Sequence, residues 1–115
     1  MRFPIGLSAS LVAYIIRQRL AHRQFVPLVL MLEPLFACNL KCSTCGRIRE
    51  YGEHSSEMMS LEECLLSTIE CEAPIVSICG GEPLIYPKIG ELVSELVNRK
   101  RYVYLCTNGV LLAES

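Results

Sequence analysis

The sequence has almost no net charge, no internal repeat and no low-complexity tract. Lysine and arginine (11 residues) nearly balance aspartate and glutamate (12 residues), which leaves a formal net charge of −1. This balance argues against broad nucleic-acid binding, which needs an excess of basic side chains. Apolar residues make up 51% of the 115 residues, so the chain can bury a core and is not expected to be disordered. The length suits one small domain.

Acidic residues are missing from the start of the chain, where none precedes Glu33. Apolar side chains recur there at every fourth position, which is typical of an amphipathic helix. We therefore predict an amphipathic helix within residues 1–25. Its apolar positions include Leu7, Leu11 and Ile15, and its end is basic, with Arg17, Arg19 and Arg23.

No apolar run is long enough to cross a membrane, since the run from Leu11 to Ile16 falls far short of the about 20 residues required. We reject a secretory signal peptide, because export would carry the cysteines described below into an oxidising space. Two interpretations of this helix remain. It packs against the rest of the domain, or residues 7–23 make a peripheral contact with the inner face of a membrane. Both place the protein in the cytoplasm.

The seven cysteines include a closely spaced triplet, Cys38, Cys42 and Cys45, in the pattern C-x3-C-x2-C. Soft thiolates favour zinc or an iron–sulfur cluster. A closed zinc site needs a fourth ligand, for which Cys64, Cys71 or Cys79 would have to serve. A cubic cluster has four irons, so three cysteines leave one iron open to a substrate. The triplet therefore favours a reactive cluster, and a zinc loop is the alternative.

Strand and helix patterns alternate after the first helix. Continuous apolar runs predict strands at 27–32, 74–79 and 102–106, and the first of these is expected to be buried on both faces of a parallel sheet. Ser60 and Glu63 form a capping box that starts a helix, and another helix is predicted through Asn98. This order predicts an α/β fold built from βα units.

Chemical motifs follow all three predicted strands. The cysteine triplet comes after the first strand, Gly80-Gly81-Glu82-Pro83 after the second, and Thr107-Asn108-Gly109 after the third. In a βα barrel, reactive groups gather at the carboxyl ends of the strands. The triplet and the Gly-Gly-Glu-Pro motif together resemble the radical S-adenosylmethionine (SAM) superfamily.

This resemblance implies roles for individual residues. Cys38, Cys42 and Cys45 would bind a [4Fe–4S] cluster that cleaves SAM to a 5′-deoxyadenosyl radical. Gly80, Gly81, Glu82 and Pro83 would hold the methionine end of SAM, with Glu82 accepting from its ammonium group. Thr107 and Asn108 would contact SAM or substrate, although a plain turn explains them equally well. Many members place an aromatic residue where Thr44 stands, so we expect the adenosyl group to be held differently or less tightly.

The resemblance also implies a fold. Residues 26–115 would form the first three βα units of a partial (β/α)6 radical SAM barrel, preceded by the amphipathic helix of residues 1–25. We expect the chain to be the amino-terminal part of a longer protein and, by itself, to be inactive. The alternative is a complete small protein that dimerises to finish its sheet.

Longer stretches are similar to the adenosyl hopene transferase family of hopanoid biosynthesis. They are residues 27–36, the Cys-Asn-Leu-Lys-Cys segment, residues 72–78 and residues 102–109. This implies an adenosyl radical that adds to a hopene-like triterpene to give adenosylhopane, with an electron donor of the flavodoxin or ferredoxin type. Another radical SAM enzyme with a different substrate, or a non-catalytic metal-binding fragment, remains as an alternative.

Cys106 stands apart from the triplet, at the end of the third predicted strand. One interpretation is a small buried residue. The other is a hydrogen-atom donor, because a thiol S–H bond is weaker than the C–H bond that would form on the product radical. We adopt Cys106 as the candidate catalytic residue.

Overall fold

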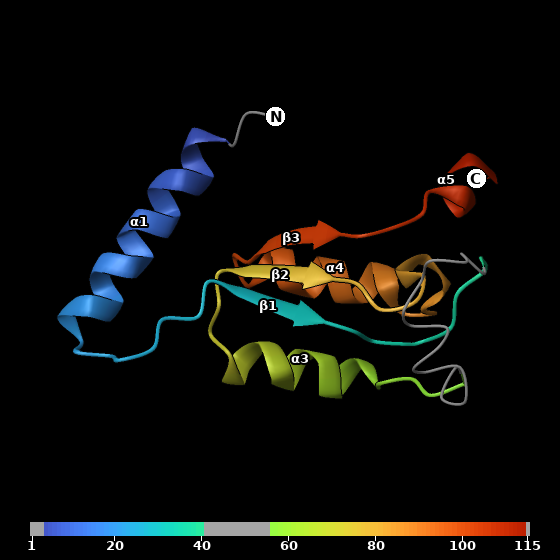
Figure 1. Cartoon of the computed structure of the whole chain (residues 1–115), viewed down its shortest axis with the longest axis horizontal. Coiled ribbons are helices and arrows are strands. Elements are labelled where there is room, and N and C mark those ends of the chain that lie inside the picture. The colour runs from blue at the N-terminus through green and yellow to red at the C-terminus, as the bar shows by residue number, and fades with distance from the viewer. Residues whose placement is uncertain (1–3, 41–55, 115) are drawn as a thin grey trace.

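The computed structural model describes residues 4–40 and 56–114. A first helix stands apart from a small sheet that two further helices cover, and the strands all point the same way (Figure 1). The elements are α1 (Ile5–Leu20), β1 (Val29–Leu32), α3 (Leu61–Glu70), β2 (Ile75–Ile78), the 3-10 helix η2 (Pro83–Ile85), α4 (Ile89–Asn98), β3 (Tyr102–Leu105) and α5 (Val110–Glu114).

The three strands form a parallel sheet in the order β1-β2-β3. Each strand lies within the range predicted from the sequence, and helices α3 and α4 connect the strands in turn. The prediction of an α/β fold with a parallel sheet is therefore confirmed. The core lies between one face of the sheet and these two helices, and it contains Leu32, Leu35, Cys64, Val76, Ile78, Tyr86, Leu92 and Leu96.

Helix α3 begins as the capping box predicts. The Ser60 hydroxyl accepts from the backbone N–H of Glu63 at 3.1 Å, and the Glu63 carboxylate accepts from the backbone N–H of Ser60 at 2.8 Å. Two otherwise unpaired donors at the helix start are thus satisfied. Helix α4 buries Leu92 and Leu96, which stand one turn apart and face the sheet.

The prediction that the first strand is buried on both faces is wrong. Val29 and Met31 are 49% and 68% exposed, whereas Leu32 is 3% exposed. The reason is that α3 and α4 cover only one face of the sheet in the described part of the chain. The register places Met31 beside Ser77 and Ser77 beside Tyr104 on the other face, which we call the open face.

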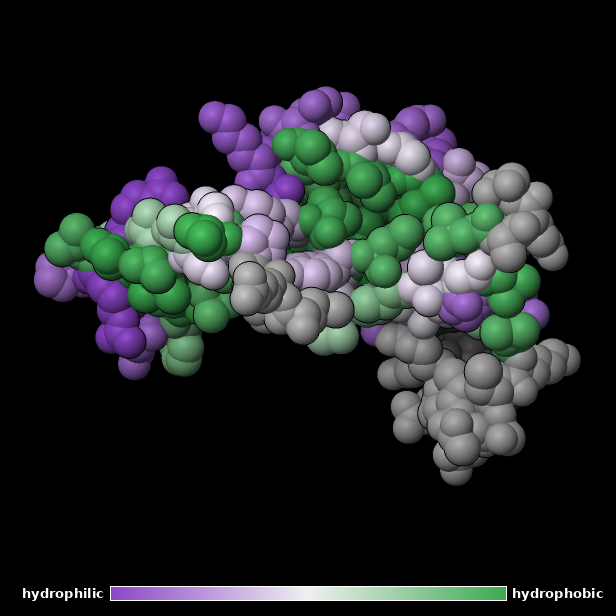
Figure 2. Space-filling view, turned by 90° about the horizontal axis from the view of Figure 1, so that it is seen from above, coloured by the Kyte–Doolittle hydropathy of each residue, from purple (hydrophilic) through white to green (hydrophobic). Residues whose placement is uncertain are grey.

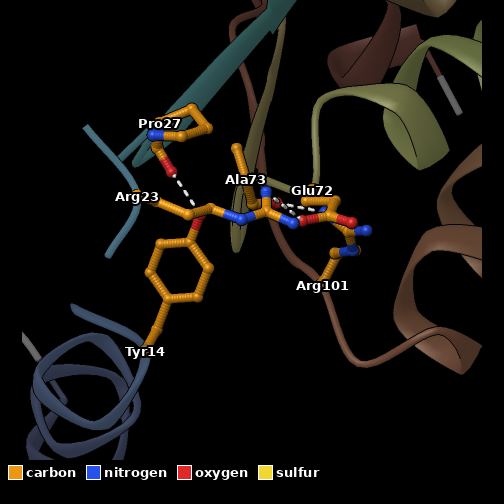
Figure 3. A network of polar contacts seen from close by, with 6 residues as sticks. All are labelled: Tyr14, Arg23, Pro27, Glu72, Ala73 and Arg101. Carbon is orange, nitrogen blue, oxygen red and sulfur yellow. Dashed lines mark hydrogen bonds and ion pairs between the residues drawn. The ribbon is translucent and has the colours of Figure 1, made fainter. Parts of the chain in front are cut away.

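Helix α1 lies beyond the amino ends of the strands (Figure 1). It ends at Leu20, short of the predicted residue 25, and His22 follows with a φ of 57°. Leu7 and Tyr14 are its buried side chains. Tyr14 Oη donates to the carbonyl of Pro27 at 2.9 Å, as Figure 3 shows.

Further polar contacts fix this end of the molecule. Arg23 pairs with Glu72 at 2.9 Å, and Arg101 donates to the carbonyl of Ala73 (Figure 3). The hydroxyls of Ser10 and Tyr102 lie 2.9 Å apart. These contacts attach α1 and the segment after it to the amino edge of the sheet. Among the described residues, no helix has the length and apolar character needed to cross a membrane.

Candidate functional site

The segments that follow β1 and β2 run side by side at the carboxyl edge of the sheet, at the right of Figure 1. The backbone N–H of Gly81 donates to the carbonyl of Leu35 at 3.1 Å, and that of Glu82 donates to the carbonyl of Ala37 at 2.8 Å. The Gly-Gly-Glu-Pro motif is therefore hydrogen-bonded to the residues that lead directly into Cys38. The described start of the first motif thus lies beside the second motif, as their positions at strand ends predict.

Gly80 and Gly81 permit this close approach. A Cβ on Gly80 would lie 2.4 Å from the carbonyl oxygen of Leu35, and one on Gly81 would lie 2.0 Å from that of Ala37. Gly80 also has a φ of 110°, which side-chain-bearing residues rarely adopt. The bare Cα atoms thus face the protein's own backbone. Their contact with SAM stays a prediction. The close approach of the two backbone segments, which explains why both positions are glycine, was not predicted from the sequence.

Glu82 is a buried carboxylate, 1% exposed, that is hydrogen-bonded on both oxygens. Its Oε1 accepts from the Thr107 hydroxyl at 2.6 Å and from the backbone N–H of Leu84 at 3.1 Å. Its Oε2 accepts from the backbone N–H of Asn108 at 2.9 Å. Glu82 therefore joins the second motif to the third.

Burial by itself raises the pKa of Glu82, because it penalises the charged form. The hydrogen bonds from Thr107, Asn108 and Leu84 outweigh this effect and hold the pKa below its ordinary value. The carboxylate is thus ionised at neutral pH. The sequence predicted the ammonium group of SAM as the partner of this carboxylate, whereas the structure shows three hydrogen-bond donors within the chain. Contact with SAM stays a prediction.

Pro83 is buried and begins η2, which turns the chain from the motif toward α4. Tyr86 ends this turn, and its hydroxyl donates to the carbonyl of Met59 at 2.9 Å. Pro83 therefore starts the turn that directly follows Glu82. Its role at the methionine end of SAM stays a prediction.

Asn108 connects the third motif to the first. Its Nδ2 donates to Asn39 Oδ1 at 2.7 Å and to Cys38 Sγ at 3.9 Å. Its Oδ1 accepts from the backbone N–H of Val110 at 3.0 Å. The sequence analysis did not identify Asn39 as a site residue, although its position directly after the first cysteine could have indicated it.

Cys106 directly follows β3 and is exposed on the open face. Its Sγ lies 3.5 Å from the hydroxyl oxygen of Ser77, and its backbone N–H donates to the carbonyl of Ile78 at 2.9 Å. The thiol is free. The interpretation of Cys106 as a buried packing residue is therefore wrong, since this side chain projects from the face that the helices leave uncovered.

The described part of the cysteine triplet is Cys38, an exposed free thiol. Cys42 and Cys45 lie outside the described residues, as does Thr44. Within residues 4–40 and 56–114, no group of three or more His, Cys, Asp or Glu side chains could hold a metal ion. An exposed thiol at the carboxyl edge, with an amide donor beside it, fits a cluster ligand.

The cysteines considered as a fourth zinc ligand differ in their surroundings. Cys64 is fully buried in the core, 3.9 Å from the Tyr86 hydroxyl, and burial raises the pKa of its thiol. Cys71 caps the carboxyl end of α3, which leads to the amino edge of the sheet. Neither position suits a ligand to a metal held by Cys38 at the carboxyl edge. Cys79 directly follows β2 at that edge, so it stays the candidate for a fourth ligand in the zinc alternative.

Comparisons with known proteins agree with this arrangement. The sequence profile described as the Radical SAM superfamily matches residues 32–115. A probable GTP 3′,8-cyclase of Methanococcus maripaludis is 37% identical over 82 residues, which cover 65% of this chain and 26% of that protein. A PqqA peptide cyclase of Granulibacter bethesdensis is 29% identical over 91 residues, which cover 77% of this chain and 24% of that protein. The chain thus spans about a quarter of the length of these curated relatives. No solved structure is significantly similar to it.

Proposed function

The chain belongs to the radical SAM superfamily, and from this premise we propose that the protein is a radical SAM enzyme that adenosylates a hopene-like triterpene. Family membership implies a [4Fe–4S] cluster and SAM as cofactors. The observation that carries the radical SAM part of the proposal is the meeting of Cys38, the Gly-Gly-Glu-Pro motif and Thr107-Asn108 at the carboxyl edge of one parallel sheet. Gly81 joins the second motif to the first, and Glu82 joins it to the third.

Cys38, Cys42 and Cys45 would hold the cluster, and residues 80–83 with Thr107 and Asn108 would lie against SAM. When bound, these cofactors supply a 5′-deoxyadenosyl radical through one-electron cleavage of SAM. The chain's own part is to hold the three motifs in register. The Glu82 carboxylate does this through its three hydrogen bonds, which also keep it ionised.

The substrate is proposed on the stretches that are similar to adenosyl hopene transferases. The open face supports an apolar substrate, because Val29, Met31 and Tyr104 are exposed there. The names of the two relatives indicate a nucleotide and a peptide as their substrates, so a different small molecule or a peptide is the alternative. A non-catalytic metal-binding chain is the second alternative.

We assign the last step to Cys106. Bound SAM would supply the adenosyl radical, whose addition to the terminal alkene would form one carbon–carbon bond and leave an unpaired electron on the adjacent carbon for Cys106 to quench. The Cys106 S–H bond then breaks, a C–H bond forms, and the unpaired electron passes to sulfur. A ferredoxin- or flavodoxin-type donor supplies one electron, and water supplies one proton, to restore the thiol.

The reaction can be tested with protein reconstituted anaerobically with iron and sulfide. Given SAM, a reductant and hopene, we expect methionine and adenosylhopane in equal amounts by mass spectrometry. Cys106→Ser keeps the shape of the side chain but lacks the weak S–H bond. We expect this variant to cleave SAM as the parent does and to yield less of the reduced product.

The outcomes separate the alternatives. SAM cleavage without a hopene product would point to another substrate, and GTP and peptide would be tried next. Stoichiometric zinc with no iron uptake would support a metal-binding chain. An unchanged product yield in Cys106→Ser, at equal cluster content, would remove the role of Cys106 as hydrogen-atom donor.

The outer face of α1 supports a peripheral contact with an anionic membrane. The face opposite Leu7 and Tyr14 carries exposed apolar side chains at helical spacing. Figure 2 shows hydrophobic side chains at the surface of this end of the molecule, at the left of the view. They are Ile5, Val12, Ile16 and Leu20, between 52% and 87% exposed. Arg17 and Arg19 lie in the last turn, and no acidic residue occurs in the helix. Basic and apolar side chains together suit an anionic lipid surface.

Co-sedimentation with vesicles tests this contact. We expect the protein to bind vesicles that contain phosphatidylglycerol and not vesicles of phosphatidylcholine alone. Ile16→Glu should weaken binding about tenfold, because burying one such side chain contributes roughly 1.5 kcal/mol or more. Leu66→Glu on α3 is the control, since Leu66 and Ile16 are 51% and 52% exposed. Equal binding by both variants would contradict the proposal. A protein that forms a dimer, which Ile16→Glu dissociates and Leu66→Glu does not, would show that this face binds a second copy of the chain instead.

A further inference from the structure

The amide of Asn108 has a fixed orientation. Its Oδ1 accepts from the backbone N–H of Val110, so its Nδ2 must point the other way. The two hydrogens of Nδ2 have two acceptors within reach, Asn39 Oδ1 at 2.7 Å and Cys38 Sγ at 3.9 Å. The contacts with Val110 and Asn39 therefore orient the Asn108 amide so that Nδ2 faces Cys38 Sγ as well.

The backbone of Asn108 is held as firmly as its side chain. Its N–H donates to Glu82 Oε2 at 2.9 Å, and the neighbouring Thr107 hydroxyl donates to Glu82 Oε1 at 2.6 Å. Thr107 Oγ1 also accepts from the backbone N–H of Gly109 at 3.1 Å. Since Glu82 is buried, these bonds are shielded from water and fix the position from which the amide reaches Cys38.

We propose that Asn108 donates an N–H···S hydrogen bond to the Cys38 thiolate and thereby raises the reduction potential of the cluster, with Glu82 as the positioning residue behind it. The inference rests on the proposed function, in that Cys38 is a cluster ligand. Hydrogen bonds to ligand sulfurs help to set the potential of iron–sulfur clusters. A donor stabilises the more negative, reduced state more than the oxidised state, so its loss makes reduction harder.

The test is the midpoint potential of the reconstituted cluster, followed by electron paramagnetic resonance without substrate. Asn108→Asp keeps an acceptor for the Val110 N–H and removes the donor. We expect the equilibrium constant for reduction to fall by up to about tenfold, because the shift reflects only the part of a roughly 1.5–3 kcal/mol hydrogen bond that differs between the oxidised and the reduced cluster. For a one-electron couple, tenfold is about 59 mV toward more negative potential. In Glu82→Gln one side-chain oxygen cannot serve Leu84, Thr107 and Asn108 as two carboxylate oxygens do, so Asn108 loses support. Loss of the negative charge by itself makes reduction easier, so a shift toward more negative potential in this variant would support the positioning role of Glu82.

Asn108→Asp also places a negative charge beside Cys38, which by itself makes reduction harder, so the neutral variant Asn108→Ser must shift the potential in the same direction. Asn98→Asp adds the same charge at the carboxyl end of α4 and should leave the potential unchanged. Asn39→Ala removes the competing acceptor and should leave the potential equal or higher. If Asn108→Asp takes up no cluster, Asn108→Ser replaces it, since a hydroxyl keeps the turn but is too short to reach the sulfur.

The results distinguish this proposal from the proposed function. An unchanged potential in Asn108→Asp or its serine replacement, at cluster content equal to that of the parent, would overturn the role of Asn108 alone. A parent protein that takes up no iron would overturn both. A shifted potential together with no reaction on hopene would support the role of Asn108 and reject the substrate.

Discussion

Replacing Cys38 by alanine abolishes the iron–sulfur cluster, whereas replacing Cys71 by alanine leaves the iron content unchanged. This is the result we expect after anaerobic reconstitution of the two variants. Cys38 is an exposed thiol at the carboxyl edge of the sheet, where the other motifs gather. With three cysteine ligands available, loss of one leaves two irons without a protein ligand, and the cluster should not survive.

Iron and sulfide analysis and the visible absorption of the cluster measure this effect. Cys42→Ala and Cys45→Ala should behave as Cys38→Ala does. Cys71 is a suitable control because it also lies at the end of an element and is partly exposed, but at the opposite edge of the sheet. Parental iron content in Cys38→Ala would reject the assignment of the triplet.

The second large effect is expected at Gly81. In Gly81→Ala the new methyl group would lie 2.0 Å from the carbonyl oxygen of Ala37 and 2.5 Å from its carbonyl carbon. Both are backbone atoms, so relief requires the segments after β1 and β2 to separate and to lose their hydrogen bonds. We expect the free energy of unfolding to fall by about 3 kcal/mol or more, at the upper end of overpacking effects.

Urea unfolding of the cluster-free protein, followed by circular dichroism, measures this loss. Gly90→Ala is the matched control, because no heavy atom lies within 4 Å of a Cβ at that position in α4. Alanine there should stabilise the protein by about 0.4–1 kcal/mol. Equal stability of Gly81→Ala and the parent would show that the two segments do not pack as closely as described.

Local patterns in the sequence were sufficient to predict the three strands, helices α3 and α4, and the edge at which the motifs gather. The capping box at Ser60 and the apolar runs depend on neighbours along the chain, and parallel strands bring their carboxyl ends to one edge whatever the details. Two of the three partners of Glu82, Thr107 and Asn108, could not be predicted. They lie 25 and 26 residues further along the chain, and only the register of β2 against β3 brings them within reach.

The exposure of β1 was mispredicted for a related reason. A continuous apolar run such as residues 27–32 is equally compatible with one covered face or two, because hydropathy reports the side chains and not what lies against them. The outward apolar side chains of α1 were similarly unassigned. Periodicity predicted an amphipathic helix, but only the contacts of Tyr14 and Ser10 show which side faces the sheet.

The attachment of α1 has a consequence for the order of events during synthesis. Tyr14 has a near partner in Pro27, but the other partners of this helix and of the segment after it lie late in the chain. Ser10 and Tyr102 are separated by 92 positions, and Arg23 and Glu72 by 49. A helix that leaves the ribosome first must therefore wait for β3 before its docking contacts exist. Until then both its inner side chains, Leu7 and Tyr14, and its outer apolar side chains face solvent. During that interval the apolar side chains of α1 are accessible to other molecules, and the interval lasts at least as long as the synthesis of residues 21–102.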